Sequence, residues 1–185
     1  KAGGAFQIGT GGANVRMTVD SANGNVGIGT STPATNLDVN GFVNWNGLSR
    51  VSTQFDKTDV TLANITGLTS TLVAGKTYQF EAVLFVNASA VGGSKFAMSG
   101  TATATAIIYE IILTDNALNT NTITSRQTAL DGNAGQAGTE AGICVIKGLI
   151  TVNAAGTLTC QFAQNAANGT SSVLVGSYMI IHQIQ

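Results

Sequence analysis

The chain has 185 residues and a net charge of −1, and only 9% of its residues are charged while 44% are hydrophobic. Soluble domains carry about 25% charged residues, so we expect copies of the chain itself to cover part of this surface. The lack of a Lys/Arg-rich run argues against nucleic-acid binding. The sequence also lacks an apolar run long enough to span a membrane, so we do not expect membrane insertion.

The first 47 residues are rich in glycine and contain an eleven-residue repeat. Three apolar pairs keep this spacing, and each pair is separated by one residue: Val15/Met17, Val26/Ile28 and Leu37/Val39. Phe6 stands eleven residues before Met17 and extends the series. This pattern predicts short strands with one apolar face. Turn-forming residues at 20–25 and 30–33 separate the predicted strands.

Strands this short cannot form a core alone, because even a two-stranded ribbon is marginal in water. Such repeats become stable by stacking and by winding around symmetry mates. We therefore expect residues 1–47 to form an oligomeric β-repeat shaft, with Met17, Ile28 and Val39 facing its axis. Trp45, at the joint with the next part of the chain, is expected to pack against its symmetry mates, with sugar binding as the alternative.

Residues 24–41, with the sequence GNVGIGTSTPATNLDVNG, resemble a segment found in many bacteriophage tail-fibre and tail-spike proteins. The pattern in those proteins is GNVGIGTxxPxxxLxVxG, and residues 16–20 before it also fit. The resemblance implies a trimeric shaft that leads into a C-terminal domain. One departure is clear, because many relatives continue with a self-cleaving chaperone and this sequence shows no charged helical stretch of that kind.

Residues 48–185 alternate between predicted strands and turns. The predicted strands are 60–64, 68–73, 77–86, 95–99, 104–114, 123–130, 142–152, 157–163 and 176–184. Strands of this number and length predict an all-β fold with an antiparallel β-sandwich head of the jelly-roll kind. Two strings, 73–81 and 154–163, also resemble a β-rich domain at the C-termini of phage fibre proteins.

Two predicted strands, 104–114 and 176–184, carry apolar side chains on both faces. An isolated antiparallel sandwich gives each strand one solvated face, so a second apolar face indicates contact between subunits. We expect the C-terminal strand, with Ile180, Ile181 and His182, to lie at or near the threefold axis of the head.

The two cysteines, Cys144 and Cys160, fall in predicted strands, and two cysteines do not make a disulfide framework. If 153–156 forms a hairpin turn, Cys160 faces Leu149 and Cys144 points to the other side of the sheet. We therefore predict two buried free thiols, which fits assembly in a reducing cytosol.

The candidate catalytic groups are few. Glu81 and Glu110 are the one carboxylate pair that could act as a glycosidase pair, and pairing with Arg126 or Lys147 is the alternative. His182 is the only histidine, and the sequence offers neither a cluster of metal ligands nor a Ser-His-Asp set. We predict no catalytic residue, no cofactor and no metal.

The polar, glycine-rich stretch 131–138 is the candidate binding loop, with Asp131, Asn133 and Gln136 as its contact residues. We predict a homotrimeric, non-enzymatic virion fibre protein, assembled in the host cytoplasm. Its expected partners are itself, other virion proteins on its N-terminal side, and a host-surface glycan or protein. The alternatives are a tail-spike glycan depolymerase with an inter-subunit active site, and a bacterial surface adhesin.

Overall fold

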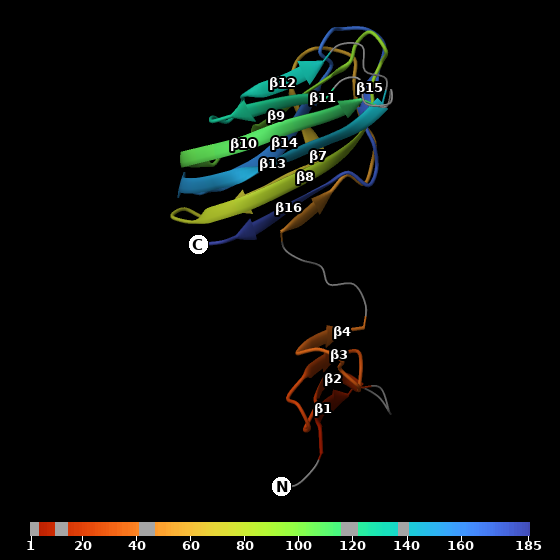
Figure 1. The fold of residues 1–185 in the computed structure, drawn as a ribbon, viewed down its shortest axis with the longest axis vertical. Coiled ribbons are helices and arrows are strands. Elements are labelled where there is room, and N and C mark those ends of the chain that lie inside the picture. The colour runs from red at the N-terminus through yellow and green to blue at the C-terminus, as the bar shows by residue number, and fades with distance from the viewer. Residues whose placement is uncertain (1–3, 10–14, 41–46, 116–121, 137–140) are drawn as a thin grey trace. The chain divides into compact units, whose positions relative to one another are not determined.

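The computed structural model describes residues 4–9, 15–40, 47–115, 122–136 and 141–185. These residues form strands without any helix, which confirms the predicted all-β class, and so none of them lies in a helix that could cross a membrane. The chain divides into two compact units, Lys1–Asn46 and Gly47–Gln185 (Figure 1).

The first unit is a four-stranded sheet with the order β1–β2–β3–β4. Its strands are β1 (Phe6–Gly9), β2 (Val15–Val19), β3 (Val26–Ile28) and β4 (Leu37–Val39). The β1–β2 and β2–β3 pairs are antiparallel, and the β3–β4 pair is parallel. The eleven-residue spacing is the register of the parallel pair, in which Val26 lies opposite Leu37 and Ile28 opposite Val39.

The repeat does not continue unchanged into β2. Because β2 runs antiparallel to β3, Val19 lies opposite Val26, whereas the repeat assigns that place to Val15. Met17 keeps its predicted position, opposite Ile28. A sequence repeat cannot reveal a change in strand direction, because the spacing of the apolar residues is similar in both cases.

The turn at 20–25 is confirmed, and its hydrogen bonds show why it forms. The Asp20 carboxylate accepts the Ala22 N–H at 2.8 Å, as Asp commonly does two residues ahead in a turn. Gly24, with φ of 74°, donates its N–H to the Asp20 carbonyl at 2.9 Å. The Asp20 N–H in turn reaches the Asn25 carbonyl at 2.8 Å, which closes the β2–β3 hairpin.

The second unit contains the strands of the predicted head. They are β5 (Leu48–Arg50), β6 (Phe55–Lys57), β7 (Ala63–Leu72), β8 (Thr77–Asn87), β9 (Ser94–Ser99), β10 (Thr103–Asp115), β11 (Thr122–Gln127), β12 (Asn133–Gln136), β13 (Ala141–Ala154), β14 (Gly156–Ala163), β15 (Ser171–Val173) and β16 (Tyr178–Gln183).

These strands form two antiparallel sheets that share one core. The larger sheet has the order β11–β10–β13–β8–β15–β6, and β16 pairs with both β8 and β5. The smaller sheet has the order β12–β9–β14–β7. Large, fully buried side chains from both sheets fill the space between them, including Phe80, Leu84, Tyr109, Ile111 and Ile146 from the larger sheet and Leu68, Phe96, Met98 and Phe162 from the smaller one.

Most predicted strands of the head are present, with two kinds of difference. The predicted strands 60–64 and 68–73 are a single strand, β7, which continues through Gly67 at a φ of 92°. The strands β5, β6 and β15 were not predicted, because three residues are too few to show a period.

The prediction of a hairpin turn at 153–156 is wrong. β13 and β14 belong to different sheets, so the chain crosses from one sheet to the other at this point. Cys160 pairs with Met98 in the smaller sheet, and Leu149 lies between Ile108 and Gln79 in the larger sheet. Both cysteines are buried and free, as predicted, although the register that led to the prediction was incorrect.

Candidate interaction surfaces

One face of the first unit's sheet is entirely apolar across its four strands. Two rows of paired residues make up this face: Phe6, Val19, Val26 and Leu37 form one row, and Ile8, Met17, Ile28 and Val39 form the other. Steps of two residues along each strand place both rows on the same side. We call these eight residues the bare face. Their exposure is highest on the edge strands, at 62% for Phe6 and Leu37.

The middle of the opposite face of the same sheet is covered by the chain itself, whereas Gln7 at its edge is exposed. Thr18 and Gly27 lie side by side there, and both are buried. A Cβ added to Gly27 would lie 2.6 Å from the Thr30 carbonyl oxygen and 3.5 Å from the Pro33 Cβ. The connection between β3 and β4 therefore packs directly on this face, and the bare face is the side left open in the single chain.

The bare face brings together the predicted axis residues Met17, Ile28 and Val39 in one continuous row. Ile28 is 40% exposed, and Met17 and Val39 are half-buried. Trp45, the fourth residue expected in this part of the axis, lies outside the described residues.

The outer face of the larger sheet in the head is a second candidate surface. Cross-strand pairing aligns four charged side chains in one row across β11, β10, β13 and β8, in the order Arg126, Glu110, Lys147 and Glu81. We call this the charged row, and the signs of its charges alternate along it. Ile180 on β16 and Leu48 on β5 continue the row beyond Glu81.

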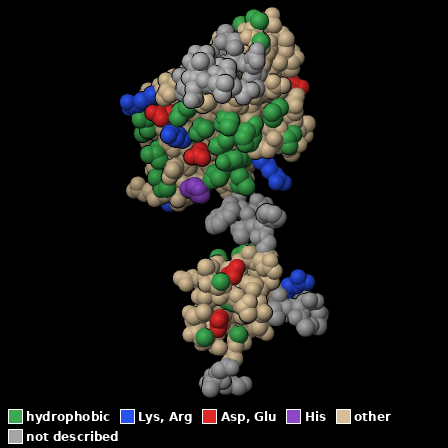
Figure 2. Space-filling view, turned by 45° about the vertical axis from the view of Figure 1, so that its right-hand side comes forward, with side chains coloured by type: hydrophobic (Ala, Val, Ile, Leu, Met, Phe, Trp, Pro, Cys, Tyr) green, Lys and Arg blue, Asp and Glu red, His purple; other side chains and the backbone are tan. Residues whose placement is uncertain are grey.

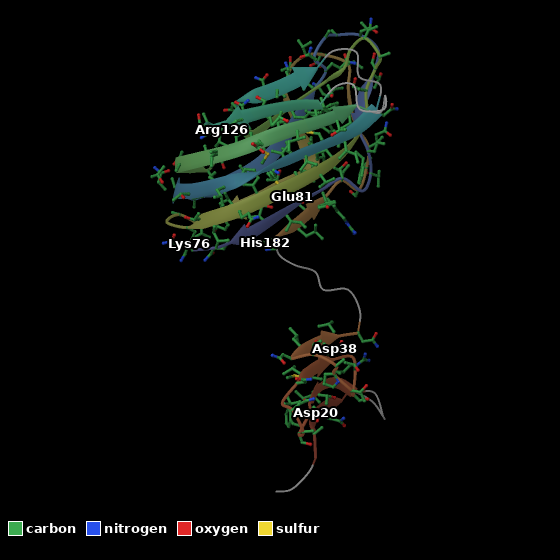
Figure 3. All side chains as sticks on the ribbon, in the orientation of Figure 1. Asp20, Asp38, Lys76, Glu81, Arg126 and His182 are labelled. Carbon is green, nitrogen blue, oxygen red and sulfur yellow. The ribbon has the colours of Figure 1, made fainter. Side chains whose placement is uncertain are left out.

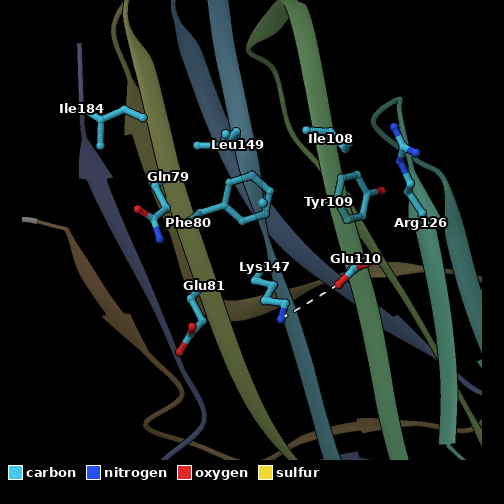
Figure 4. A pocket seen from close by; sticks show the side chains of 11 residues that line it. Gln79, Phe80, Glu81, Ile108, Tyr109, Glu110, Arg126, Lys147, Leu149 and Ile184 are labelled. Carbon is cyan, nitrogen blue, oxygen red and sulfur yellow. Dashed lines mark ion pairs between the residues drawn. The ribbon is translucent and has the colours of Figure 1, made fainter.

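Among the described residues, only the middle of the charged row forms an ion pair. Lys147 Nζ lies 4.0 Å from Glu110 Oε2, and the two side chains are 53% and 44% exposed (Figure 4). An ion pair this exposed contributes little stability. Arg126 and Glu81, at the two ends, are exposed and form no ion pair with any residue that the structure describes.

Apolar side chains flank the charged row. Ile108 and Leu149 lie on one side of it, 40% and 42% exposed, and Ile112 and Val145 lie half-buried on the other. Figure 2 shows hydrophobic side chains gathered on one face of the head around acidic and basic ones. A shallow depression of about 820 Å³ lies in this face, and its lining includes all four residues of the charged row. Exposed apolar side chains grouped on one face can serve a protein contact.

The last strand, β16, divides its side chains between the core and the outer face of the sheet. Met179 and Ile181 are 0% and 8% exposed and belong to the core. Ile180 is half-buried and His182 is exposed, and both lie on the outer face. This placement corrects the expectation for Ile181, which is a core residue of its own chain rather than one open to a symmetry mate.

The two glutamates do not stand as an isolated carboxylate pair. Glu81 and Glu110 are on β8 and β10, so β13 separates them by two strand spacings, about 10 Å. Lys147 lies between them, in register with both. A glycosidase holds its substrate between two carboxyl groups about 5–9.5 Å apart, whereas a cationic side chain stands at this point of the sheet. The arrangement matches the predicted alternative, in which Glu110 pairs with Lys147.

The candidate binding loop, 131–138, is partly a strand. Asn133–Gln136 forms β12 and pairs with β9 at the edge of the smaller sheet, which corrects the expectation of a continuous loop. Gln136 is the last residue of this strand, and 137–138 lie outside the described residues. This strand could not be predicted from the polar, glycine-containing sequence, because its residues have low β propensity.

The start of this stretch is tied to the core. Asp131 has a φ of 64° and donates its N–H to the Met98 carbonyl at 2.7 Å. The buried Tyr109 hydroxyl donates to the Gly132 carbonyl at 2.7 Å. Asp131 and Asn133 are nevertheless exposed, so this edge can present polar side chains from a fixed backbone.

Neither thiol is suited to nucleophilic chemistry at neutral pH. Burial raises the pKa of Cys160 from 9.0 to about 12, and burial together with nearby Cys160 raises the pKa of Cys144 well above 9.0. The thiolate is the reactive form of cysteine. Among the described residues, no three His, Cys, Asp or Glu side chains gather as metal ligands.

No family model matches this chain, and no curated protein matches it.

Proposed function

We propose that this chain is a structural and receptor-binding component of a bacteriophage fibre and acts as a homotrimer. Residues 1–47 would form the shaft, and residues 48–185 a jelly-roll-like head. The observation that carries the proposal is a bare apolar face in the first unit, opposite a face whose middle its own chain already covers.

The bare face supports a shaft of several chains. Burying a Leu or Phe side chain contributes roughly 1.5–3 kcal/mol, and this small sheet leaves such side chains open on one side only. In one of its two rows, Met17, Ile28 and Val39 follow the eleven-residue spacing. The resemblance of residues 24–41 to phage fibre segments supports three chains and a place in the virion.

The head supports attachment rather than chemistry. Its outer face mixes apolar and charged side chains on a rigid sheet, and Asp131 and Asn133 are presented at an edge of the other sheet. Within the proposal, the head contacts a host-surface glycan or protein, or another virion protein, and the N-terminal side joins the rest of the virion.

The direct test is to locate the chain in the particle. Virions of a phage that encodes this sequence would be labelled with an antibody raised against the purified chain and viewed by negative-stain electron microscopy. The proposal predicts label on fibres. Label that is absent from intact particles, while the same antibody recognises the chain in lysates, would contradict it.

A further inference from the structure

The two ends of the charged row carry opposite charges that form no ion pair with the described residues of the chain. Arg126 lies on β11, at one edge of the larger sheet, and Glu81 lies on β8 next to β16 (Figure 3). β10 and β13 stand between them, so the two residues are three strand spacings apart, about 14 Å. Arg126 and Glu81 of one chain are therefore too far apart to form an ion pair with each other.

A second copy of the chain could supply the opposite charge that each end of the charged row lacks. A face that is positive at one end and negative at the other is complementary to itself when copies follow one another head to tail, and such contacts can close into a ring. Glu110 and Lys147 already contact each other at 4.0 Å, which leaves Arg126 and Glu81 as the charges available to a neighbour.

The apolar side chains around the row fit the same contact. Leu48 is 42% exposed and Ile180 is half-buried, and both lie in register with Glu81 on the β16–β5 side. The β11 edge of a neighbouring head, placed over β16 and β8, would cover these two residues and bring Arg126 toward Glu81.

We propose that neighbouring heads in the trimer contact each other through this outer face, with Arg126 of one copy paired to Glu81 of the next. The pair fixes the register of the contact, since like charges would meet if the face were shifted by one strand. This inference rests on the proposed trimer, to which it adds the contact surface and the residues that align it.

The test is a charge swap in the full chain, read as molar mass by light scattering over a dilution series. Arg126→Glu and Glu81→Arg should each raise the concentration at which half of the trimers dissociate by about tenfold or more, since each places like charges together. The double variant carries the pair in reverse and should return this concentration to within about threefold of the wild-type value.

The controls separate this inference from the proposed trimer. Lys76→Glu reverses a charge outside the row and should leave the dissociation concentration unchanged, and circular dichroism should show that all variants are folded. A wild-type trimer that neither single variant weakens, or a double variant no better than the worse single one, would overturn the Arg126–Glu81 contact alone. A stable wild-type dimer would overturn the ring, and a wild-type monomer would overturn the proposed trimer itself.

Discussion

At the scale of single residues, the core of the head has a close approach at Gly148 that leaves no room for a side chain. Gly148 lies in register between Tyr109 and Phe80, whose ring centroids are 6.1 Å apart and tilted by 55°. A Cβ at this position would meet the Ile108 carbonyl oxygen and the Tyr109 Cβ. The two rings can therefore approach each other across β13 only because residue 148 is glycine.

Replacing this glycine should destabilise the head. Gly148→Val adds three carbons to a filled space, and overpacking of this kind costs about 1–3 kcal/mol. Thermal unfolding followed by circular dichroism measures the effect. Gly4→Val is the matched control, because nothing lies within 4 Å of a Cβ at that position. Equal transition temperatures for both variants would show that the core tolerates a side chain at 148.

The buried hydroxyl of Tyr109 should make stability fall at alkaline pH. Burial raises its pKa from 10.0 to about 12. Because the folded pKa is above the unfolded one, this contribution is complete below pH 10.0 and is lost as the pH rises toward 12. Urea midpoints across this range should fall less steeply for Tyr109→Phe, although that variant loses about 1 kcal/mol with its hydrogen bond. Identical slopes would contradict the assignment.

At the scale of elements, β16 separates two environments along one strand. Met179 and Ile181 point into the core, while Ile180 and His182 lie on the outer face. In β1, at the edge of the first unit, all four residues are exposed, and successive side chains lie on opposite faces of the sheet. Adjacent residues of β16 therefore serve different surfaces, the core of the second unit and its outer face.

Substitutions on β16 should distinguish folding from assembly. Ile181→Asp places an unpaired charge in the core and should cost about 3–5 kcal/mol, seen as loss of the cooperative unfolding transition. Ile180→Asp should keep that transition and lower the molar mass of the assembly. Gln185→Asp, at an exposed position, should change neither property. Normal trimers of Ile180→Asp would remove β16 from the interface.

A second pair of neighbours tests the bare face. Ile8 is 47% exposed and belongs to that face, whereas Gln7 lies opposite Thr18 on the other side of the sheet. Ile8→Asp should weaken assembly, measured as the dissociation concentration in light scattering, because it places a charge among apolar side chains. Gln7→Asp should have no such effect, and an equal response of both variants would contradict a role for the bare face.

Long strands with a clear period could be predicted from the sequence, and other elements could not. The two apolar faces of β10 and β16 followed from alternation alone. The direction of β2 was not predicted, because a repeat does not reveal strand direction. The crossing between β13 and β14 was not predicted either, because the same local sequence pattern is compatible with a hairpin and with a change of sheet. The charged row was also beyond the sequence, since its residues come from four strands and only the register aligns them.

At the scale of the whole molecule, both units present an apolar surface that the described residues do not cover. The first unit leaves eight apolar residues on one face, and the head leaves exposed apolar side chains beside the charged row. A chain with 9% charged residues has few solvated ions with which to shield such surfaces. The proposed association of identical chains would account for both surfaces and for the composition.

The molar mass of the purified full chain tests this account most directly. Light scattering coupled to size-exclusion chromatography should give three times the chain mass of 18.7 kDa, and the value should stay constant over a wide concentration range. A mass of 18.7 kDa at every concentration, from a protein with a cooperative unfolding transition, would contradict the proposal that copies of this chain cover its apolar faces.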